Sequence, residues 1–137
     1  MKISAILLAV GVLAGCSSNA TSTTAEQSDL VYQQYITAQS LVPTRAIKTF
    51  KLHRWEALSE QSVLMTSRGD DYLFTLQNRC SGLDDAAAVK VNNNNIVVQF
   101  SNRPATVGNP QLVPAHCLIK AIYPLTVAQA TELRNLR

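Results

Sequence analysis

The chain has 137 residues, of which 47% are hydrophobic and 15% are charged, and its formal net charge at pH 7 is +3. This length allows one domain and excludes a multidomain enzyme. The hydrophobic fraction is too high for a disordered chain, and the charge and the 6% aromatic content are too low for a nucleic-acid-binding surface. We therefore expect a small globular protein with no nucleic-acid partner.

The N-terminus has the pattern of an export signal. Lys2 supplies a positive charge, and a mostly apolar run follows at residues 3–12. A run of this length is too short to span a bilayer, which takes about 20 residues, but it suits the hydrophobic region of a signal peptide. We therefore predict that residues 1–15 are a signal peptide.

The signal ends in the motif Leu13, Ala14, Gly15 and Cys16, which resembles the lipobox of bacterial lipoproteins. The resemblance implies cleavage before Cys16, whose thiol then carries a diacylglycerol. Two or three acyl chains, each contributing about 0.8 kcal/mol per buried methylene, would make the membrane a permanent partner. In such lipoproteins an aspartate after the cysteine favours the inner membrane. Because this chain has Ser17, the resemblance implies the periplasmic face of the outer membrane.

The segment after the cysteine is small and polar, so residues 16–27 are predicted to be the lipidated cysteine and a flexible linker. A single β-rich globular domain is predicted to follow at residues 28–137. Its first element is a helix at residues 29–40, because Ser28 suits an N-cap and apolar residues then recur at helical spacing. Pro43 is expected to stop this helix.

Strands are predicted at residues 50–53, 63–65, 72–76, 88–91, 96–100 and 117–123. The turn at residues 67–71 contains Gly69, and the turn at residues 92–95 consists of four asparagines, so both favour hairpins. Trp55 is expected to anchor the core. Residues 101–115 are rich in proline and form the longest predicted loop.

Pro124 is expected to end the last strand. Thr126 and Gln129 then match a capping box, which predicts a short terminal helix at residues 127–135. The predicted fold class is α+β, mainly β, with a curled or closed antiparallel sheet of five to six strands and a helix at each end of the domain.

A set of mostly apolar residues and two cysteines recurs across the predicted strands: Ile47, Phe50, Trp55, the strand 72–76, Cys80, Leu83, Cys117, Leu118, Ile119 and Ile122. Their pattern resembles a family of uncharacterised bacterial lipoproteins with a domain of unknown function. The resemblance covers roughly residues 30–125 and implies no known activity. The chain departs from the family pattern at residues 99–115, which are proline-rich and nearly uncharged.

Two cysteines, Cys80 and Cys117, remain besides Cys16, and an even pair beyond an export signal predicts a disulfide. A zinc site made by these two cysteines with His53 and His116 is the alternative, but the spacing of zinc motifs is absent. We therefore expect neither a metal nor another cofactor.

No catalytic residues are predicted. His53 alternates with core residues and is expected to face solvent, and no nucleophile motif accompanies either histidine. The pairs Asp70–Asp71 and Asp84–Asp85 admit calcium binding or sugar hydrolysis, but adjacent carboxylates are also common in turns. The chain is therefore not expected to be an enzyme.

A basic run at Arg45, Lys48, Lys51 and Arg54 is either a solvated face or a contact with anionic head groups or peptidoglycan. Removing Lys2 with the signal leaves a net charge of about +2, which argues against a dominant electrostatic partner. The leading interpretation is a non-enzymatic, membrane-anchored lipoprotein that binds or supports another envelope component. The alternative is a carrier of a small apolar ligand or lipid inside the curled sheet.

Overall fold

The computed structural model describes residues 20–92, 94–99 and 115–137. The predicted signal peptide, Cys16 and nearly all of the predicted loop at residues 101–115 lie outside these residues. In chain order the elements are α1 (Ala20–Ala38), β1 (Leu52–Ser59), β2 (Ser62–Ser67), β3 (Asp70–Leu76), β4 (Ala88–Asn92), β5 (Asn95–Gln99), β6 (Ala115–Leu125) and α2 (Val127–Asn135).

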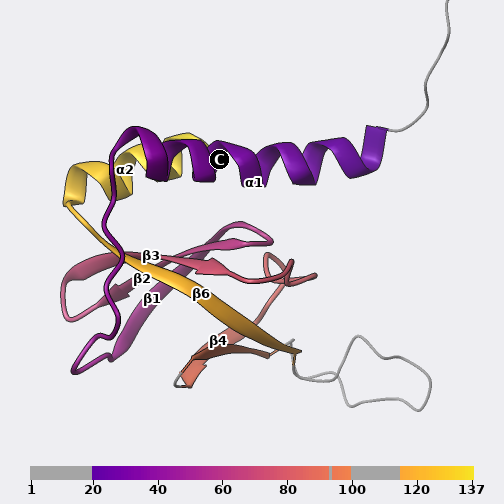
Figure 1. Cartoon of the computed structure of the whole chain (residues 1–137). Coiled ribbons are helices and arrows are strands. Elements are labelled where there is room, and N and C mark those ends of the chain that lie inside the picture. Colours follow the sequence, from indigo (N-terminus) through magenta and orange to yellow (C-terminus); the bar gives the residue numbers. More distant parts are fainter. Residues whose placement is uncertain (1–19, 93, 100–114) are drawn as a thin grey trace, which may run out of the picture.

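The six strands form one antiparallel sheet in the order β1-β2-β3-β6-β5-β4. The sheet curls until it is nearly closed, and both helices lie on one side of it (Figure 1). The α+β, mainly β fold predicted from the sequence is therefore confirmed. The two predicted hairpins are present as β2–β3 and β4–β5.

The central strands β2 and β3 are buried on both faces, so the protein has two cores. Successive side chains of a strand point to opposite faces, and along β2 Val63 and Met65 face inward while Leu64 faces the helices. The inner core, enclosed by the curled sheet, contains Ala57, Val63, Met65, Phe74, Leu76, Cys80, Leu83, Val89, Ile96 and Val98. The helix-side core contains Tyr32, Ile36, Leu58, Leu64, Leu73, Ala130 and Leu133.

Helix α1 begins at Ala20, nine residues before the predicted start, so the expectation of a flexible linker through Gln27 is wrong from Ala20 onward. Ala25, Glu26 and Gln27 are good helix formers. The polarity of residues 20–27 led to the prediction of a flexible linker, but a polar segment can still be helical. Once the packed part of α1 has formed, each further residue adds one backbone hydrogen bond without a new nucleus.

Helix α1 ends through a left-handed residue rather than through the predicted proline. Ser40 has a φ of 49°, and the Leu41 N–H donates to the Ile36 carbonyl at 3.0 Å while the Ser40 N–H donates to the Thr37 carbonyl at 3.1 Å. These two bonds form a Schellman motif, and both Leu41 and Ile36 belong to the helix-side packing that usually accompanies it.

Replacing Ser40 with glycine is expected to stabilise the protein by about 0.5–1 kcal/mol, because glycine adopts positive φ without the Cβ clash. Chemical denaturation measures this change. Gln34→Gly, at an exposed position inside the same helix, should instead destabilise by about 1 kcal/mol. Equal effects of the two substitutions would contradict the left-handed cap.

The strand β6 continues through Pro124, where the sequence predicted its end. The carbonyl of Ile122 points away from β3, since it accepts the N–H of Thr44 on the outer edge. Backbone groups alternate along a strand with period two, so the nitrogen of Pro124 faces the same outer edge. A proline is tolerated there because no ladder hydrogen bond to β3 is lost.

The turn of the β2–β3 hairpin consists of Arg68 and Gly69, with φ values of 54° and 93°. Two consecutive positive φ angles define the primed turn whose twist matches that of the flanking strands. This explains the glycine that signalled the hairpin in the sequence.

Neither α1 nor α2, the helices within the described residues, is long and apolar enough to cross a membrane.

Candidate functional site

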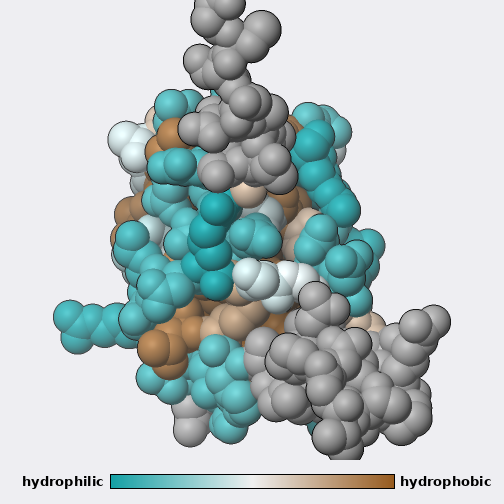
Figure 2. All heavy atoms as spheres, turned by 90° about the vertical axis from the view of Figure 1, so that its right-hand side faces the viewer, coloured by the Kyte–Doolittle hydropathy of each residue, from teal (hydrophilic) through white to brown (hydrophobic). Residues whose placement is uncertain are grey.

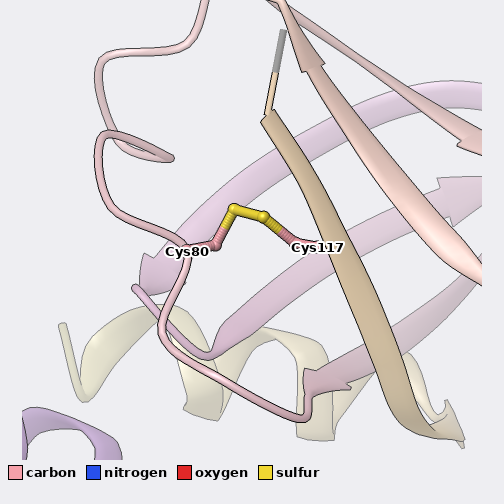
Figure 3. The surroundings of a disulfide bond; sticks show 2 residues. All are labelled: Cys80 and Cys117. Atoms are coloured by element: carbon pink, nitrogen blue, oxygen red, sulfur yellow. A yellow bond between two sulfur atoms is a disulfide. The ribbon is translucent and has the colours of Figure 1, made fainter. Parts of the chain in front are cut away.

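Cys80 and Cys117, which are 37 positions apart in the chain, form a disulfide, as the sequence predicted, with their Cα atoms 5.9 Å apart. Cys80 comes from the loop that follows β3, and Cys117 from the first part of β6 (Figure 3). The Cys80 N–H also donates to the carbonyl of Glu60 at 2.8 Å. The bridge therefore joins the loop after β3 to the last strand and packs into the inner core.

The four side chains considered for zinc do not meet as a site. Cys80 and Cys117 are bonded to each other, while His53 and His116 are exposed. His116 and Cys117 are neighbours in β6 and point to opposite faces, as their positions in a strand require. Among the described residues, no group of three or more His, Cys, Asp or Glu side chains is placed to hold a metal ion.

The two carboxylate pairs lie in different parts of the fold. Asp70 and Asp71 begin β3, where Asp71 accepts a hydrogen bond from the Thr66 hydroxyl at 2.5 Å. Asp84 and Asp85 lie in the loop between β3 and β4. Asp84 and Asp85 thus occupy a turn, whereas Asp70 and Asp71 follow the hairpin turn and pair with Ser67 and Thr66 of β2.

The ion pairs of the described residues are concentrated on the helix side of the sheet. Arg79 pairs with Asp29 at 3.1 Å and with Glu60 at 3.5 Å. Glu56 pairs with Arg134 at 3.1 Å and with Arg137 at 3.4 Å. These pairs tie α1 to the loop after β3, and the end of α2 to β1, while each exposed pair adds little stability by itself.

Three buried polar atoms between α1 and the sheet have no hydrogen-bond partner among the described residues: Asp29 Oδ1, the Tyr32 hydroxyl and Ser62 Oγ. The side chain of Asp29 is only 9% exposed, and burial raises the pKa of Tyr32. Two hollows border this region, one of about 270 Å³ at Ser28 and one of about 310 Å³ at Asp29. An unsatisfied buried group costs about 1–3 kcal/mol, so this interface is less stabilising than its apolar contacts suggest.

The hydroxyl of Tyr35 joins the two helices by donating to Glu132 at 2.6 Å. Burial, followed by the hydrogen bond to Glu132 and its negative charge, raises the pKa of Tyr35 to about 12. Because the neutral phenol is favoured in the folded state, its contribution to stability is complete below pH 10. That contribution is lost as the pH rises through about 12.

We expect Tyr35→Phe to reduce the fall in unfolding free energy between pH 10 and pH 12, since phenylalanine does not ionise. Urea denaturation at pH 8, 10, 11 and 12 measures this slope. Glu132→Gln should reduce the slope partly, because the carboxylate charge is removed but the phenol remains. A slope unchanged by both substitutions would contradict the assignment.

The basic run does not form an ion-paired face. Arg45, Lys48, Lys51 and Arg54 are exposed, and every ion pair found among the described residues uses another arginine. The face seen in Figure 2, at the end where α1 begins, is mostly hydrophilic in its described part, with smaller hydrophobic areas.

The basic and acidic residues are unevenly distributed along the chain, which the net charge does not reveal. The stretches 30–55 and 86–131 contain seven Lys or Arg residues and none of the nine acidic residues. The first stretch includes the segment 43–51, which meets β6 at the bridge between Thr44 and Ile122, and the second includes β4, β5 and β6. The exposed basic residues of these segments are Arg45, Lys48, Lys51, Lys90 and Lys120. Counting charges by segment would have found this pattern in the sequence.

These features define a class of small, disulfide-bonded α+β protein in which two helices cover one face of a curled antiparallel sheet. Over residues 1–137 the chain matches the family of unknown function DUF6491, and it belongs to that family. The membership in a family of unknown function that the sequence motifs indicated is thereby confirmed. No curated protein and no solved structure is significantly similar to the chain.

Proposed function

We propose that this protein is a lipid-anchored periplasmic lipoprotein that acts as a non-enzymatic binding or support module of the bacterial envelope. The observation that carries the proposal is the short apolar leader ending in Leu13, Ala14, Gly15 and Cys16. A leader of this length does not span a bilayer, and the small residues before Cys16 suit cleavage followed by lipid attachment to its thiol.

The disulfide between Cys80 and Cys117 supports export, since such bonds form and persist in oxidising compartments and are rare in the cytosol. The exposure of His53 and His116 supports a binding role over a catalytic one, because catalytic imidazoles are usually held between a nucleophile and an orienting acid. The proposal thus combines a secreted domain with a surface that recognises a partner.

Labelling cells with radioactive palmitate tests the anchor. The wild-type protein is expected to incorporate the label and to sediment with membranes, whereas Cys16→Ala should remain unlabelled. Cys80→Ala serves as the matched control, because it removes a cysteine that the proposal does not lipidate. Absence of label from the wild-type protein, or processing elsewhere than before Cys16, would disprove the anchor.

The choice of membrane rests on Ser17. We place the protein at the periplasmic face of the outer membrane, and Ser17→Asp is expected to move it to the inner membrane. Density-gradient separation of the two membranes measures this shift. Ser18→Asp adds the same charge one residue later and is expected to leave the location unchanged. Recovery of the wild-type protein in the inner membrane would contradict the outer-membrane placement.

The packing inside the curled sheet helps to decide between a ligand cavity within the sheet and a binding site on the outer surface. Large side chains occupy that interior, and Met65, Phe74, Leu83 and Ile96 are each fully buried there. A carrier of a lipid or another apolar ligand needs an apolar cavity of several hundred Å³. The filled interior therefore favours recognition through the outer surface. Crosslinking in intact cells tests this preference, and recovery of lipid alone would favour the carrier instead.

A further inference from the structure

The outer edge of β6 is covered by two different segments with a break between them. The strand β5 pairs with the first part of β6, and the Ile119 N–H donates to the carbonyl of Asn94 at 2.8 Å. Farther along, the Thr44 N–H donates to the carbonyl of Ile122 at 2.8 Å. Among the described residues, no strand pairs with β6 on this edge between these two hydrogen bonds.

A hollow of about 450 Å³ lies at this break. Its floor is the strand from Ile119 to Ile122, and its walls are the segment 43–45 on one side and Asn94 on the other. This volume falls within the usual range of ligand pockets. Ile119 and Ile122 already bond Asn94 and Thr44 on this edge, so an occupant of the hollow meets the main chain of the strand between these two residues, together with the side chains of the lining.

The charge of the hollow has one sign. Arg45 and Lys120 line it, both are exposed, and no carboxylate belongs to its lining. Lys48 and Lys51 are exposed in the segment that contains Arg45, and Lys90 is exposed in β4. Such a one-signed recess raises the local concentration of anions and orients an approaching anionic group.

We propose that this hollow binds a short extended peptide that carries free carboxylates. The peptide lies in the gap between the two covering segments, beside the main chain of Lys120, and its carboxylates contact the guanidinium of Arg45 and the ammonium of Lys120. A peptide fits better than a bilayer surface, because a flat array of head groups does not reach a recess floored by strand backbone. The proposal rests on the proposed binding role but not on the lipid anchor.

Titration of the full-length protein in detergent micelles tests the proposal. The probe is the acetylated, amidated tetrapeptide Ala-Glu-Ala-Glu, with Ala-Gln-Ala-Gln as the uncharged counterpart, followed by calorimetry and by the amide NMR signals of β6. We expect saturable binding of the acidic peptide at low salt, weakened as salt is added, and shifts at residues 119–122. The uncharged peptide should bind at least fivefold more weakly.

The double variant Arg45→Gln/Lys120→Gln should bind the acidic peptide at least fivefold more weakly than the wild-type protein. Both side chains are exposed, so the fold should be retained, and thermal unfolding verifies this. Lys90→Gln is the matched control, since it removes an exposed positive charge from β4 outside the hollow, and its affinity should stay within twofold.

Three results would overturn the proposal: no binding of the acidic peptide by the wild-type protein, equal binding by the double variant, or displacement of the peptide by an equal concentration of glycerol phosphate. The last result would assign the hollow to lipid head groups. Palmitate labelling gives an independent outcome, so failure of the anchor and failure of peptide binding are distinguishable.

Discussion

Removing the disulfide by Cys80→Ala/Cys117→Ala is expected to lower the free energy of unfolding by about 4 kcal/mol. The bond closes a loop of 37 residues, and the chain-entropy relation gives about this value for the lost constraint on the unfolded chain. For a domain of this size the midpoint of thermal unfolding should fall by roughly 15 °C. Calorimetry and urea denaturation of the purified variant measure both quantities.

The position of the bond explains why the effect should be large. The closed loop includes the hairpin of β4 and β5, which, within the described part of the chain, pairs with the rest of the sheet through β5 and β6 alone. Reduction of the wild-type protein is the matched control, since both sulfur atoms then remain available to pack in the inner core. Reduction should have a similar effect on the wild-type protein and none on the double variant. A loss below 1 kcal/mol in both cases would contradict this role of the bond.

Phe74→Ala is expected to destabilise the protein by about 3–5 kcal/mol, because truncating a buried aromatic residue removes its transfer free energy and leaves a cavity. Phe74 is fully buried, and its ring packs edge-on against Phe50 with centroids 5.6 Å apart. Its neighbours across the sheet are Val63 in β2 and Ile122 in β6. Urea denaturation should therefore show a much lower midpoint.

Val127→Ala provides the comparison for this core substitution. Val127 is 77% exposed at the start of α2, and its truncation should change stability by less than about 0.5 kcal/mol. Phe74→Leu should fall between the two, since a smaller apolar side chain leaves a smaller cavity. If Phe74→Ala cost no more than Val127→Ala, the assignment of this face of β3 to the inner core would be wrong.

Secondary structure was predictable where local chemistry decides it. Gly69 marked the turn of the first hairpin, where Arg68 and Gly69 both take positive φ. Thr126 and Gln129 signalled the start of α2, and each makes the reciprocal hydrogen bond of a capping box. Such interactions join residues close in sequence, so their pattern is visible in the chain itself.

The errors concern elements whose limits depend on distant contacts. The end of α1 uses Ser40 in a left-handed conformation, and the packing of Leu41 on the helix-side core supports it. The tolerance of Pro124 within β6 depends on which edge of the strand carries no partner at that residue. The core beneath Leu41 and the pairing on the outer edge of β6 both involve segments distant in the sequence, so local propensity could not identify these limits.

The candidate binding site shows the same division. The sequence indicated the basic run that begins at Arg45, but its net charge of +3 suggested no strong electrostatic partner. Lys120 lies 75 positions farther along the chain, and only the bridge between Thr44 and Ile122 places its strand beside the segment that contains Arg45. The hollow is therefore a product of the sheet topology.

The sequence by itself determined the α+β composition, the hairpins, the cysteine pair and the membership in a family of unknown function. It does so because turn chemistry, capping and the period of apolar residues act over a few neighbouring positions. Only the tertiary structure decided the order of the strands, the two separate cores and the meeting of Arg45 with Lys120 at one hollow. These features arise from pairing between distant segments, which many sequences with the same local pattern could arrange differently.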